Sequence, residues 1–262
     1  MVCLDYLETH IINICNLKCK GCSHFSPFVQ LEDKDVSIEN FERDLRIFAK
    51  KIDYIYQFRM LGGEPFLCGN ITDYIRIARD ILPDTDIRVV TNGTLIKNTD
   101  EKVFETFAQH NIGIDISHYP VFDKYIEIVI EILQKYKIDC RISERIELFH
   151  KRLNLNGDSD INEVFRDCPA KKCAFFLDGQ LANCSAPLLA KFINKRFGTD
   201  IKTDSSTFDL LQPEYTGEDI IEYLSKPMPA CSYCSKPQEF KWESVKTVKL
   251  EDWLIGEECD ER

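Results

Sequence analysis

Apolar segments and amphipathic segments alternate along roughly the first 143 residues of this chain. Five of the segments are rich in β-branched and apolar residues, which is typical of strands. The predicted strands cover residues 4–14, 55–61, 86–91, 112–117 and 138–143, and the predicted helices between them cover residues 38–52, 70–82, 99–109 and 122–136. Strands separated by helices need crossover connections, which favour a parallel sheet curled like part of a barrel.

The alternation stops near residue 144, and a polar stretch over residues 154–160 leads into a cysteine-rich segment. A hairpin is predicted there, with strands over 174–178 and 181–184 around Asp178 and Gly179. We therefore predict an α/β fold in two parts. Residues 1–150 form a partial (β/α)6-type TIM barrel with a parallel sheet, and residues 151–262 form a small cysteine-rich α+β domain that ends in a short solvated tail.

Charge and hydropathy exclude several classes of protein. Lysine and arginine number 33 against 44 aspartates and glutamates, which gives a formal net charge of −11. A surface of this sign repels phosphate backbones, so duplex nucleic acid is not an expected partner. No apolar run approaches the roughly 18 residues that span a bilayer, and the N-terminus lacks the pattern of a signal peptide. We expect a cytoplasmic protein without a membrane partner.

Twelve cysteines are many for a reducing compartment, where clustered thiolates hold metals more often than they form disulfides. Three of them, Cys15, Cys19 and Cys22, are spaced CxxxCxxC in the loop CNLKCKGC. Three thiolates in a compact loop suit three irons of a cubic iron–sulfur cluster and leave the fourth iron open for a ligand. A zinc site completed by His24 is the alternative.

A second motif ends the second predicted strand, where residues 60–66 are MLGGEPF. Adjacent glycines there allow a ligand to approach the backbone closely. Together, CxxxCxxC after the first strand and GGEP after the second resemble the radical S-adenosylmethionine (SAM) enzymes over about residues 4–143. The resemblance implies that Cys15, Cys19 and Cys22 hold a 4Fe-4S cluster whose open iron binds SAM.

The same resemblance implies further contacts to SAM. Gly62, Gly63 and Glu64 match the residues that contact the methionyl amino group, and Pro65 shapes the turn. A carboxylate beside an ammonium group is electrostatically favourable. Two more strand ends, VVTNG and IDISHY, resemble family elements. Their candidate contacts to the ribose or carboxylate of SAM are Thr91, Asn92 and Ser117.

The chemistry of the family is implied as well. One electron enters the cluster, SAM is cleaved reductively to methionine and a 5′-deoxyadenosyl radical, and the radical abstracts hydrogen from a substrate. The protein has to position the substrate and exclude water and oxygen, because the difficult chemistry belongs to the cofactor. The resemblance therefore implies an oxygen-sensitive enzyme with an electron donor such as flavodoxin or ferredoxin as its partner.

Polar residues near the carboxyl ends of the strands are candidates for substrate chemistry. His118 and Tyr119 follow the fourth predicted strand and are the candidate catalytic residues. The alternative role is a structural hydrogen bond for His118 and Tyr119, and packing among aromatic residues for His24. For Arg141 and Glu144 the alternative is an exposed ion pair. The further candidates for substrate binding are His24, Arg141, Glu144, Glu8 and Asp115.

The second cysteine group fits C-x10-G-x4-C between Cys168 and Cys184, and it continues with CxxC at Cys231 and Cys234. A structural zinc ribbon is one interpretation. The spacing also resembles the twitch domain, a shortened relative of the SPASM domain, which implies one auxiliary 4Fe-4S cluster held by these four thiolates. Cys173 is an alternative ligand in place of Cys168, and we choose Cys168.

Three functions are compatible with these motifs. The first is a radical SAM enzyme for a small molecule, either sugar-like, a cyclitol or a modified base, acting as a dehydrogenase, lyase or epimerase. An aminocyclitol dehydrogenase and a queuine lyase are examples. The second is modification of a ribosomally made peptide, against which no extra N-terminal peptide-binding domain is expected because the first strand begins within about four residues of Met1. The third is a noncatalytic zinc-binding module.

Overall fold

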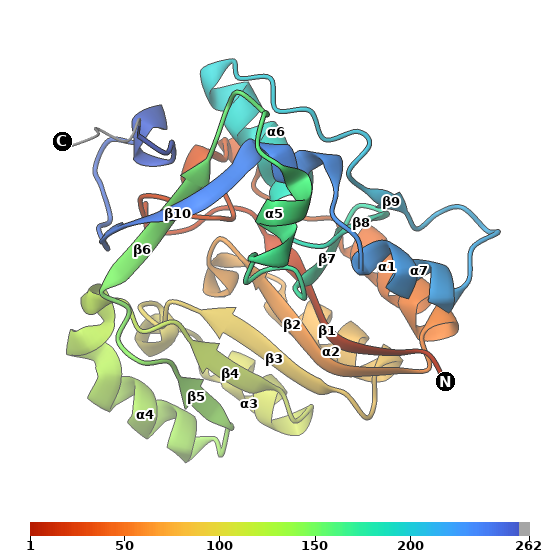
Figure 1. Ribbon diagram of the computed structural model, residues 1–262. Helices are drawn as coiled ribbons and strands as arrows, with labels where there is room; N and C mark the ends of the chain where they lie inside the picture. The colour runs from red at the N-terminus through yellow and green to blue at the C-terminus, as the bar shows by residue number, and fades with distance from the viewer. Residues whose placement is uncertain (257–262) are drawn as a thin grey trace.

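The computed structural model describes residues 1–256, so Cys259 and the rest of the predicted tail beyond residue 256 lie outside the described residues. One eight-stranded sheet forms the centre, in the order β5-β4-β3-β2-β1-β7-β8-β9 (Figure 1). The strands from β5 to β7 in this order run parallel, and β8 pairs antiparallel with both β7 and β9. The bounds are β1 Cys3–Ile12, β2 Tyr54–Gly62, β3 Asp86–Thr91, β4 Gly113–Ile116, β5 Cys140–Ile142, β7 Ala174–Leu177, β8 Gln180–Ala182 and β9 Phe208–Asp209.

Four helices connect the first five strands and confirm the predicted alternation. They are α1 Ile38–Lys51, α2 Ile71–Ile81, α3 Glu101–Gln109 and α4 Ile126–Lys135. Helix α1 begins where its amphipathic pattern predicts, because the hydroxyl of Ser37 accepts a hydrogen bond from the backbone N–H of Asn40 at 3.1 Å. The predicted start of the fourth helix at residue 122 is wrong, because residues Pro120–Tyr125 form 3-10 turns before α4.

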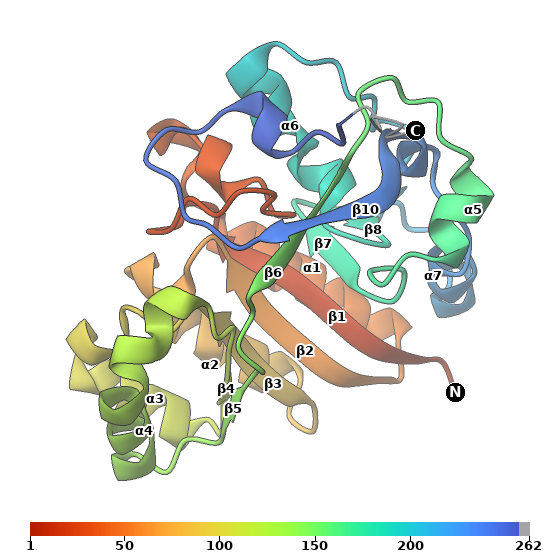
Figure 2. The same ribbon diagram turned by 60° about the vertical axis from the view of Figure 1, so that its left-hand side comes forward.

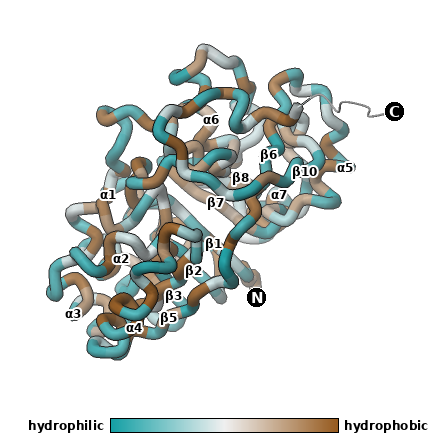
Figure 3. Tube along the Cα trace, turned by 90° about the vertical axis from the view of Figure 1, so that its left-hand side faces the viewer, coloured by the Kyte–Doolittle hydropathy of each residue, from teal (hydrophilic) through white to brown (hydrophobic). Residues whose placement is uncertain are grey.

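Helices α1–α4 cover the outer face of the sheet, and the core lies between them and the strands. Brown and teal segments alternate along α2–α4 in Figure 3, as expected of helices with one buried face. Phe58 of β2 and Phe176 of β7 are fully buried on this side of the sheet. The adjacent Phe175 points to the inner face, where it joins a second core with Phe28 and Trp253.

The C-terminal part begins with a two-stranded antiparallel ribbon, β6 Leu148–Leu153 with β10 Cys234–Lys241. In Figure 2 this ribbon crosses over the inner side of β1 and β2. The predicted hairpin is confirmed as β7 and β8, with positive φ at Asp178 and Gly179 in the turn between them. The remaining helices are α5 Ile161–Arg166, α6 Ala186–Phe197 and α7 Gly217–Leu224.

The hairpin adds to the main sheet, since β7 pairs in parallel with β1. Residues on both sides of the predicted boundary at 150 therefore share one sheet, and the division into two domains stays a prediction. No helix among residues 1–256 is long and apolar enough to cross a membrane.

Candidate functional site

The first cysteine group lies in the loop that follows β1, at the carboxyl end of the sheet. Its thiols are neighbours. Burial raises the pKa of Cys19 to about 12, and the nearby Cys22 contributes to that rise. Burial also raises the pKa of Cys15, with Cys22 and Cys19 adding to the effect.

A 4Fe-4S cluster binds each thiolate through a different iron, so its ligands must be neighbours without converging on one point. No three Cys, His, Asp or Glu side chains among residues 1–256 meet closely enough to hold a single metal ion. Three neighbouring thiols in one loop, one buried and two half-buried, fit a cluster with one open iron.

Gly62 and Gly63, at the end of β2, lie against the backbone at the start of this loop. A Cβ at Gly62 would lie 2.0 Å from the carbonyl oxygen of Ile12, and a Cβ at Gly63 would lie 1.9 Å from that of Ile14. The backbone N–H groups of Gly63 and Glu64 donate to those same two carbonyls at 3.0 and 2.9 Å. The two glycines therefore let the GGEP segment pair with the residues immediately before Cys15, where no side chain fits.

Glu64 links the ends of β2 and β3. Its side chain is fully buried, and its carboxylate accepts hydrogen bonds from the Thr91 hydroxyl at 2.6 Å and from the backbone N–H groups of Asn92 at 2.9 Å and Phe66 at 3.2 Å. Burial raises the pKa of Glu64 to about 7, against the lowering effect of these three donors. The predicted SAM contacts Glu64, Thr91 and Asn92 are thus brought together, and Pro65 begins the turn after them.

Asn92 carries this network to the cysteine loop. Its amide donates to Asn16 Oδ1 at 2.9 Å and lies 3.8 Å from the sulfur of Cys15. Thr94 closes the network, because its hydroxyl donates to Asn92 Oδ1 and accepts from Asn16. Ser117 lies at the next strand end, where its backbone N–H donates to the carbonyl of Thr91 at 2.9 Å.

The two tryptophans of the chain both pack against the cysteine loop, and neither was predicted as a functional residue. Trp253 donates its indole N–H to the carbonyl of Cys22 at 3.0 Å. The indole N–H of Trp242 is buried and has no hydrogen-bond partner among residues 1–256. Trp242 lies close to the thiol of Cys19 and lowers its pKa, although burial raises that pKa by more. Two large aromatic residues in an otherwise polar C-terminal segment were the available signal.

Residues 242–245 also pair with the cysteine loop through their backbone. Lys20 N–H donates to the carbonyl of Glu243 at 3.0 Å, and Val245 N–H donates to that of Lys18 at 2.9 Å. The same segment follows β10, whose first residue is Cys234. One continuous stretch of chain thus connects the second cysteine group with the first.

Of the two candidate catalytic residues, Tyr119 lies by the cysteine loop. Its ring stacks on Trp242 with centroids 5.2 Å apart, and its pKa is raised by burial and by the neighbouring Cys19 and Cys22. His118 is held elsewhere, because its Nε2 lies 2.7 Å from the carboxylate of Asp123. That hydrogen bond is the structural role that the sequence left open for His118.

Charged residues line the inner face of the sheet. Asp115 pairs with Arg59 at 2.8 Å and also with the buried Arg88. The carboxylate of Glu8, which is 7% exposed, accepts from the hydroxyl of Tyr6 at 2.6 Å. Burial raises the pKa of Glu8 to about 7, opposed by Tyr6 and Arg59.

This raised pKa predicts a pH-dependent stability. Between pH 4.5 and 7 the native Glu8 still holds a proton that the unfolded chain has lost, so Glu8 makes the native state less stable as the pH rises through this range. Glu8→Gln should remove about 3 kcal/mol of that decline. The free energy of unfolding in urea, measured from pH 4.5 to 8 for both proteins, tests this. Parallel curves would contradict it.

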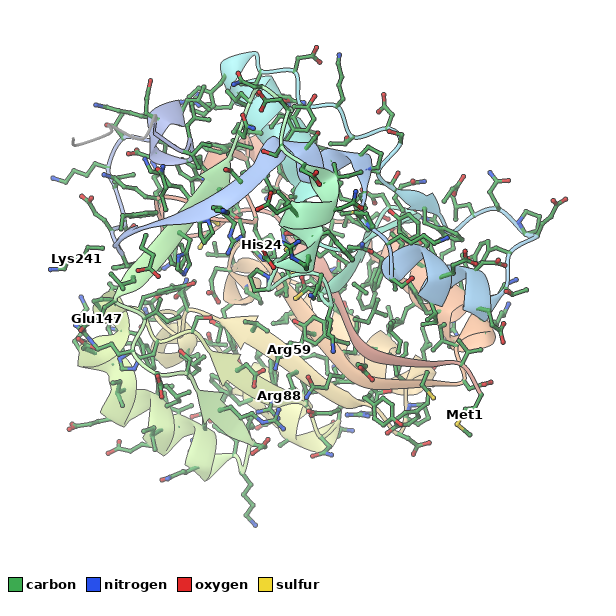
Figure 4. All side chains as sticks on the ribbon, viewed as in Figure 1. Met1, His24, Arg59, Arg88, Glu147 and Lys241 are labelled. Atoms are coloured by element: carbon green, nitrogen blue, oxygen red, sulfur yellow. The ribbon has the colours of Figure 1, made fainter. Side chains whose placement is uncertain are left out.

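A cavity of about 420 Å³ lies between the two cysteine groups. Its lining includes Glu8 of β1 and His24 of the first cysteine loop, together with Cys168, Cys184 and Cys234. Figure 4 shows His24 between the sheet and the β6–β10 ribbon, with Arg59 and Arg88 lower on the sheet. Two predicted substrate residues, one on β1 and one in the loop that follows it, therefore share one cavity.

The four cysteines chosen as auxiliary ligands are neighbours. Burial raises the pKa of Cys184, and Cys234, Cys168 and Cys231 add to the effect. Burial likewise raises the pKa of Cys234 to about 12, with contributions from Cys231 and Cys168. Cys173 lies between this group and Glu8. Its pKa is raised to about 11 by burial, then by the carboxylate of Glu8, and then by one of the four thiols, Cys168.

Two predicted substrate residues lie away from this cavity. Arg141 is exposed in the middle of β5 and pairs at 3.3 Å with Asp86, the first residue of β3. Its guanidinium therefore lies toward the amino ends of the strands. Glu144 is exposed in the segment after β5.

Comparison with known proteins places this geometry in a family. The model of the radical SAM superfamily matches residues 9–151. GTP 3′,8-cyclase of Sulfurimonas denitrificans is 32% identical over 115 residues, which cover 43% of this chain and 35% of the relative. The same enzyme of Aliarcobacter butzleri is 23% identical over 172 residues, which cover 64% of this chain and 53% of the relative. The chain thus spans only about a third to a half of these curated relatives.

A solved structure matches over most of the chain. The crystal structure of BtrN in complex with AdoMet and 2-DOIA covers 89% of this chain and 92% of that chain, with a TM-score of 0.53 and 15% sequence identity. This match shows a shared fold, namely a partial barrel with a mainly parallel sheet and a small extra sheet. Because the family model covers more than half of its residues, the chain belongs to the radical SAM superfamily and is an enzyme of that superfamily.

Proposed function

We propose that this radical SAM enzyme abstracts hydrogen from a small-molecule substrate held in the cavity between its two cysteine groups. The observation that supports this most strongly is the cavity itself, because one wall comes from the loop of Cys15, Cys19 and Cys22. Its volume of about 420 Å³ includes the space beside Cys168, Cys184 and Cys234 that the auxiliary cluster proposed below would fill, so the substrate would occupy the part lined by Glu8 and His24. Polar groups such as Glu8 and His24 among apolar walls are typical of small-molecule sites.

The residues of the first group fit the cofactors that the superfamily implies. When bound, the cluster and SAM supply a hydrogen-abstracting radical from the adenosyl part of SAM. The chain supplies three thiolates for the cluster, and Glu64, Thr91 and Asn92 hold the loop of Cys15 in place. Gly62, Gly63 and Ser117 stay candidates for direct contact with SAM. Tyr119 and Trp242 cover the cysteine loop and exclude water from it.

We propose a sugar-like or cyclitol substrate ahead of a modified base, with a dehydrogenase, lyase or epimerase reaction. The fold match to BtrN, which was crystallised with 2-DOIA, supports this choice. Glu8 and His24 supply hydrogen-bonding groups for hydroxyl or amino substituents, and Asp115 supports the inner face beneath them. A flavodoxin or ferredoxin is the proposed electron donor, and a cytoplasmic location stays a prediction.

The enzyme should be tested anaerobically after cluster reconstitution. With SAM and dithionite, it should form 5′-deoxyadenosine, and a perdeuterated cyclitol such as 2-DOIA should transfer deuterium to that product. Queuine and a mixture of peptides serve as competing substrates, and Cys19→Ala serves as the inactive control. Deuterium transfer from a peptide but from neither small molecule would contradict the proposal.

We also propose an auxiliary 4Fe-4S cluster in a twitch-like domain, held by Cys168, Cys184, Cys231 and Cys234. Their mutual proximity supports this ligand set, and four protein thiolates leave no iron open for substrate. A role in electron transfer or in shaping the cavity therefore fits better than direct ligation of substrate.

The choice of Cys168 over Cys173 makes a specific prediction. Cys168→Ala should lose roughly four iron atoms per chain after reconstitution, because one cluster has lost a ligand. Cys173→Ala is the matched control and should keep its full iron content. Iron and sulfide analysis of both variants tests this, and loss of iron from Cys173→Ala alone would reverse the assignment.

A further inference from the structure

Two histidines from different segments form a hydrogen-bonded pair beside the cavity. His10 lies near the end of β1 and is fully buried, and its Nε2 is 2.9 Å from Nδ1 of His24. The rings are 5.0 Å apart, and both pack edgewise against Phe175. His24 lines the cavity, and His10 lies behind it. One nitrogen of this contact must donate and the other must accept.

Asn13 decides which nitrogen of His10 carries the proton. The Nδ2 of Asn13 donates to the carbonyl of Asp33 at 2.9 Å, and its backbone N–H donates to the carbonyl of Lys34 at 2.8 Å. The Oδ1 of Asn13 therefore faces Nδ1 of His10, at 2.9 Å. Turning the amide over would bring its oxygen against the Asp33 carbonyl, which also only accepts. Since Oδ1 cannot donate, Nδ1 of His10 must carry the proton.

The order of donors then continues to the cavity. With its proton on Nδ1, a neutral His10 accepts at Nε2, so His24 must donate from Nδ1. A neutral His24 that is protonated at Nδ1 has a bare Nε2. A second proton on either ring would place a charge against Phe175 and beside another imidazole, and no carboxylate among residues 1–256 hydrogen-bonds to either ring. The only ring nitrogen of the pair left to face a ligand is then Nε2 of His24.

We propose that Asn13 and His10 are positioning residues that fix the tautomer of His24, so that its Nε2 presents a hydrogen-bond acceptor to the cavity. The ligand it would take carries an O–H or N–H donor, as a polyol or an aminocyclitol does. Glu8, two residues before His10 on the same strand, lines the same cavity and supplies a second hydrogen-bonding group. This inference rests on the proposed function only in taking the cavity as the substrate site.

Nitrogen NMR of the imidazoles tests the tautomer without any substrate. The full-length enzyme, with its clusters loaded and oxidised, is labelled with ¹⁵N-histidine, and His10→Gln and His24→Gln assign the signals by their loss. We expect both His10 and His24 to carry their proton at Nδ1 and to be bare at Nε2. A proton at Nε2 of His24, alone or on a doubly protonated ring, would overturn the inference whatever the substrate is.

Two substitutions at Asn13 separate positioning from a merely structural role. Asn13→Leu removes the acceptor for His10, so His24 should show both tautomers, with at least a tenth of the population protonated at Nε2. Asn13→Asp adds a charge that favours a second proton on His10, whose Nε2 would then donate, so His24 should move to the tautomer that is protonated at Nε2. An unchanged His24 tautomer in Asn13→Leu, with normal iron content, would overturn the role of Asn13. Failure of the substrate panel described above would leave these spectra unchanged and would count against the proposed function alone.

Discussion

Gly63→Ala should abolish cluster loading and with it all SAM cleavage. A Cβ at this position would lie 1.9 Å from the carbonyl oxygen of Ile14 and 2.6 Å from the backbone nitrogen of Cys15. Both atoms belong to the backbone, so no side chain can rotate to relieve the overlap, and the cysteine loop has to move. Overpacking of this kind costs about 1–3 kcal/mol in stability. The cost to the site is larger, because the three thiols must stay neighbours to share one cluster.

Gly69 provides the matched control for this substitution. It lies exposed a few residues further along, and a Cβ there would meet no atom within 4 Å. Gly69→Ala should therefore keep wild-type iron content and wild-type yields of 5′-deoxyadenosine. The measurements are iron per chain, cluster absorbance and SAM cleavage under dithionite. If Gly63→Ala bound as much iron per chain as Gly69→Ala does, the close approach of Gly63 to the backbone of Ile14 and Cys15 would not be what holds the loop in place.

The partial barrel could be predicted because its pattern is local. Helix α1 was predicted over residues 38–52 and is observed at Ile38–Lys51, and β3 was predicted over 86–91 and is observed at Asp86–Thr91. Apolar residues at helical or alternating spacing must face the core wherever the element lies in the fold. The preference of Asp-Gly for a tight turn is equally local, as the turn at Asp178 and Gly179 shows.

The neighbours of each element could not be predicted in the same way. Strand β7 pairs with β1, with Ala174 opposite Leu7, and nothing in either segment specifies a partner so distant in sequence. Trp242 and Trp253 reach the cysteine loop from the far end of the chain for the same reason. Their contacts depend on the path of β10, and the sequence of residues 234–241 carries no clear strand pattern.

The site shows the same division between motif and placement. Each cysteine group and the GGEP motif could be found in the sequence, and the resemblance to a family gave their roles. Glu8, His24, Arg141 and Glu144 were equivalent candidates, because a residue type and a predicted element do not say which way a side chain points. The structure separates them, with Glu8 and His24 in the cavity and Arg141 paired with Asp86 away from it.

Glu64 shows that a motif residue can be named correctly while its contacts stay hidden. The resemblance implies a contact from its carboxylate to the amino group of SAM. In the structure, the carboxylate already accepts from Thr91, Asn92 and Phe66. All three partners donate, so the side chain at this position must accept at both oxygens. This requirement leads to the second large effect that we expect.

Glu64→Gln should lower SAM cleavage on the order of 100-fold, because misplacement of a reacting group by about 1 Å has an effect of that size. The new amide nitrogen can face either Asn92 or the pair formed by Thr91 and Phe66. Each orientation sets a donor against a backbone N–H and leaves that N–H unpaired, which costs about 1–3 kcal/mol. Asn92 then loses its fixed position 3.8 Å from the sulfur of Cys15.

The exposed Glu105 of α3 provides a control of identical chemistry, and Glu105→Gln should leave stability and activity unchanged. Urea unfolding, iron content and initial rates of 5′-deoxyadenosine formation distinguish the two contributions. Normal iron with a slow rate would place the effect on the position of SAM, whereas lost iron would place it on the cysteine loop. A Glu64→Gln enzyme with the free energy of unfolding and iron content of the wild type, and with a rate within twofold of it, would contradict this prediction. The carboxylate would then organise neither the cysteine loop nor the position of SAM.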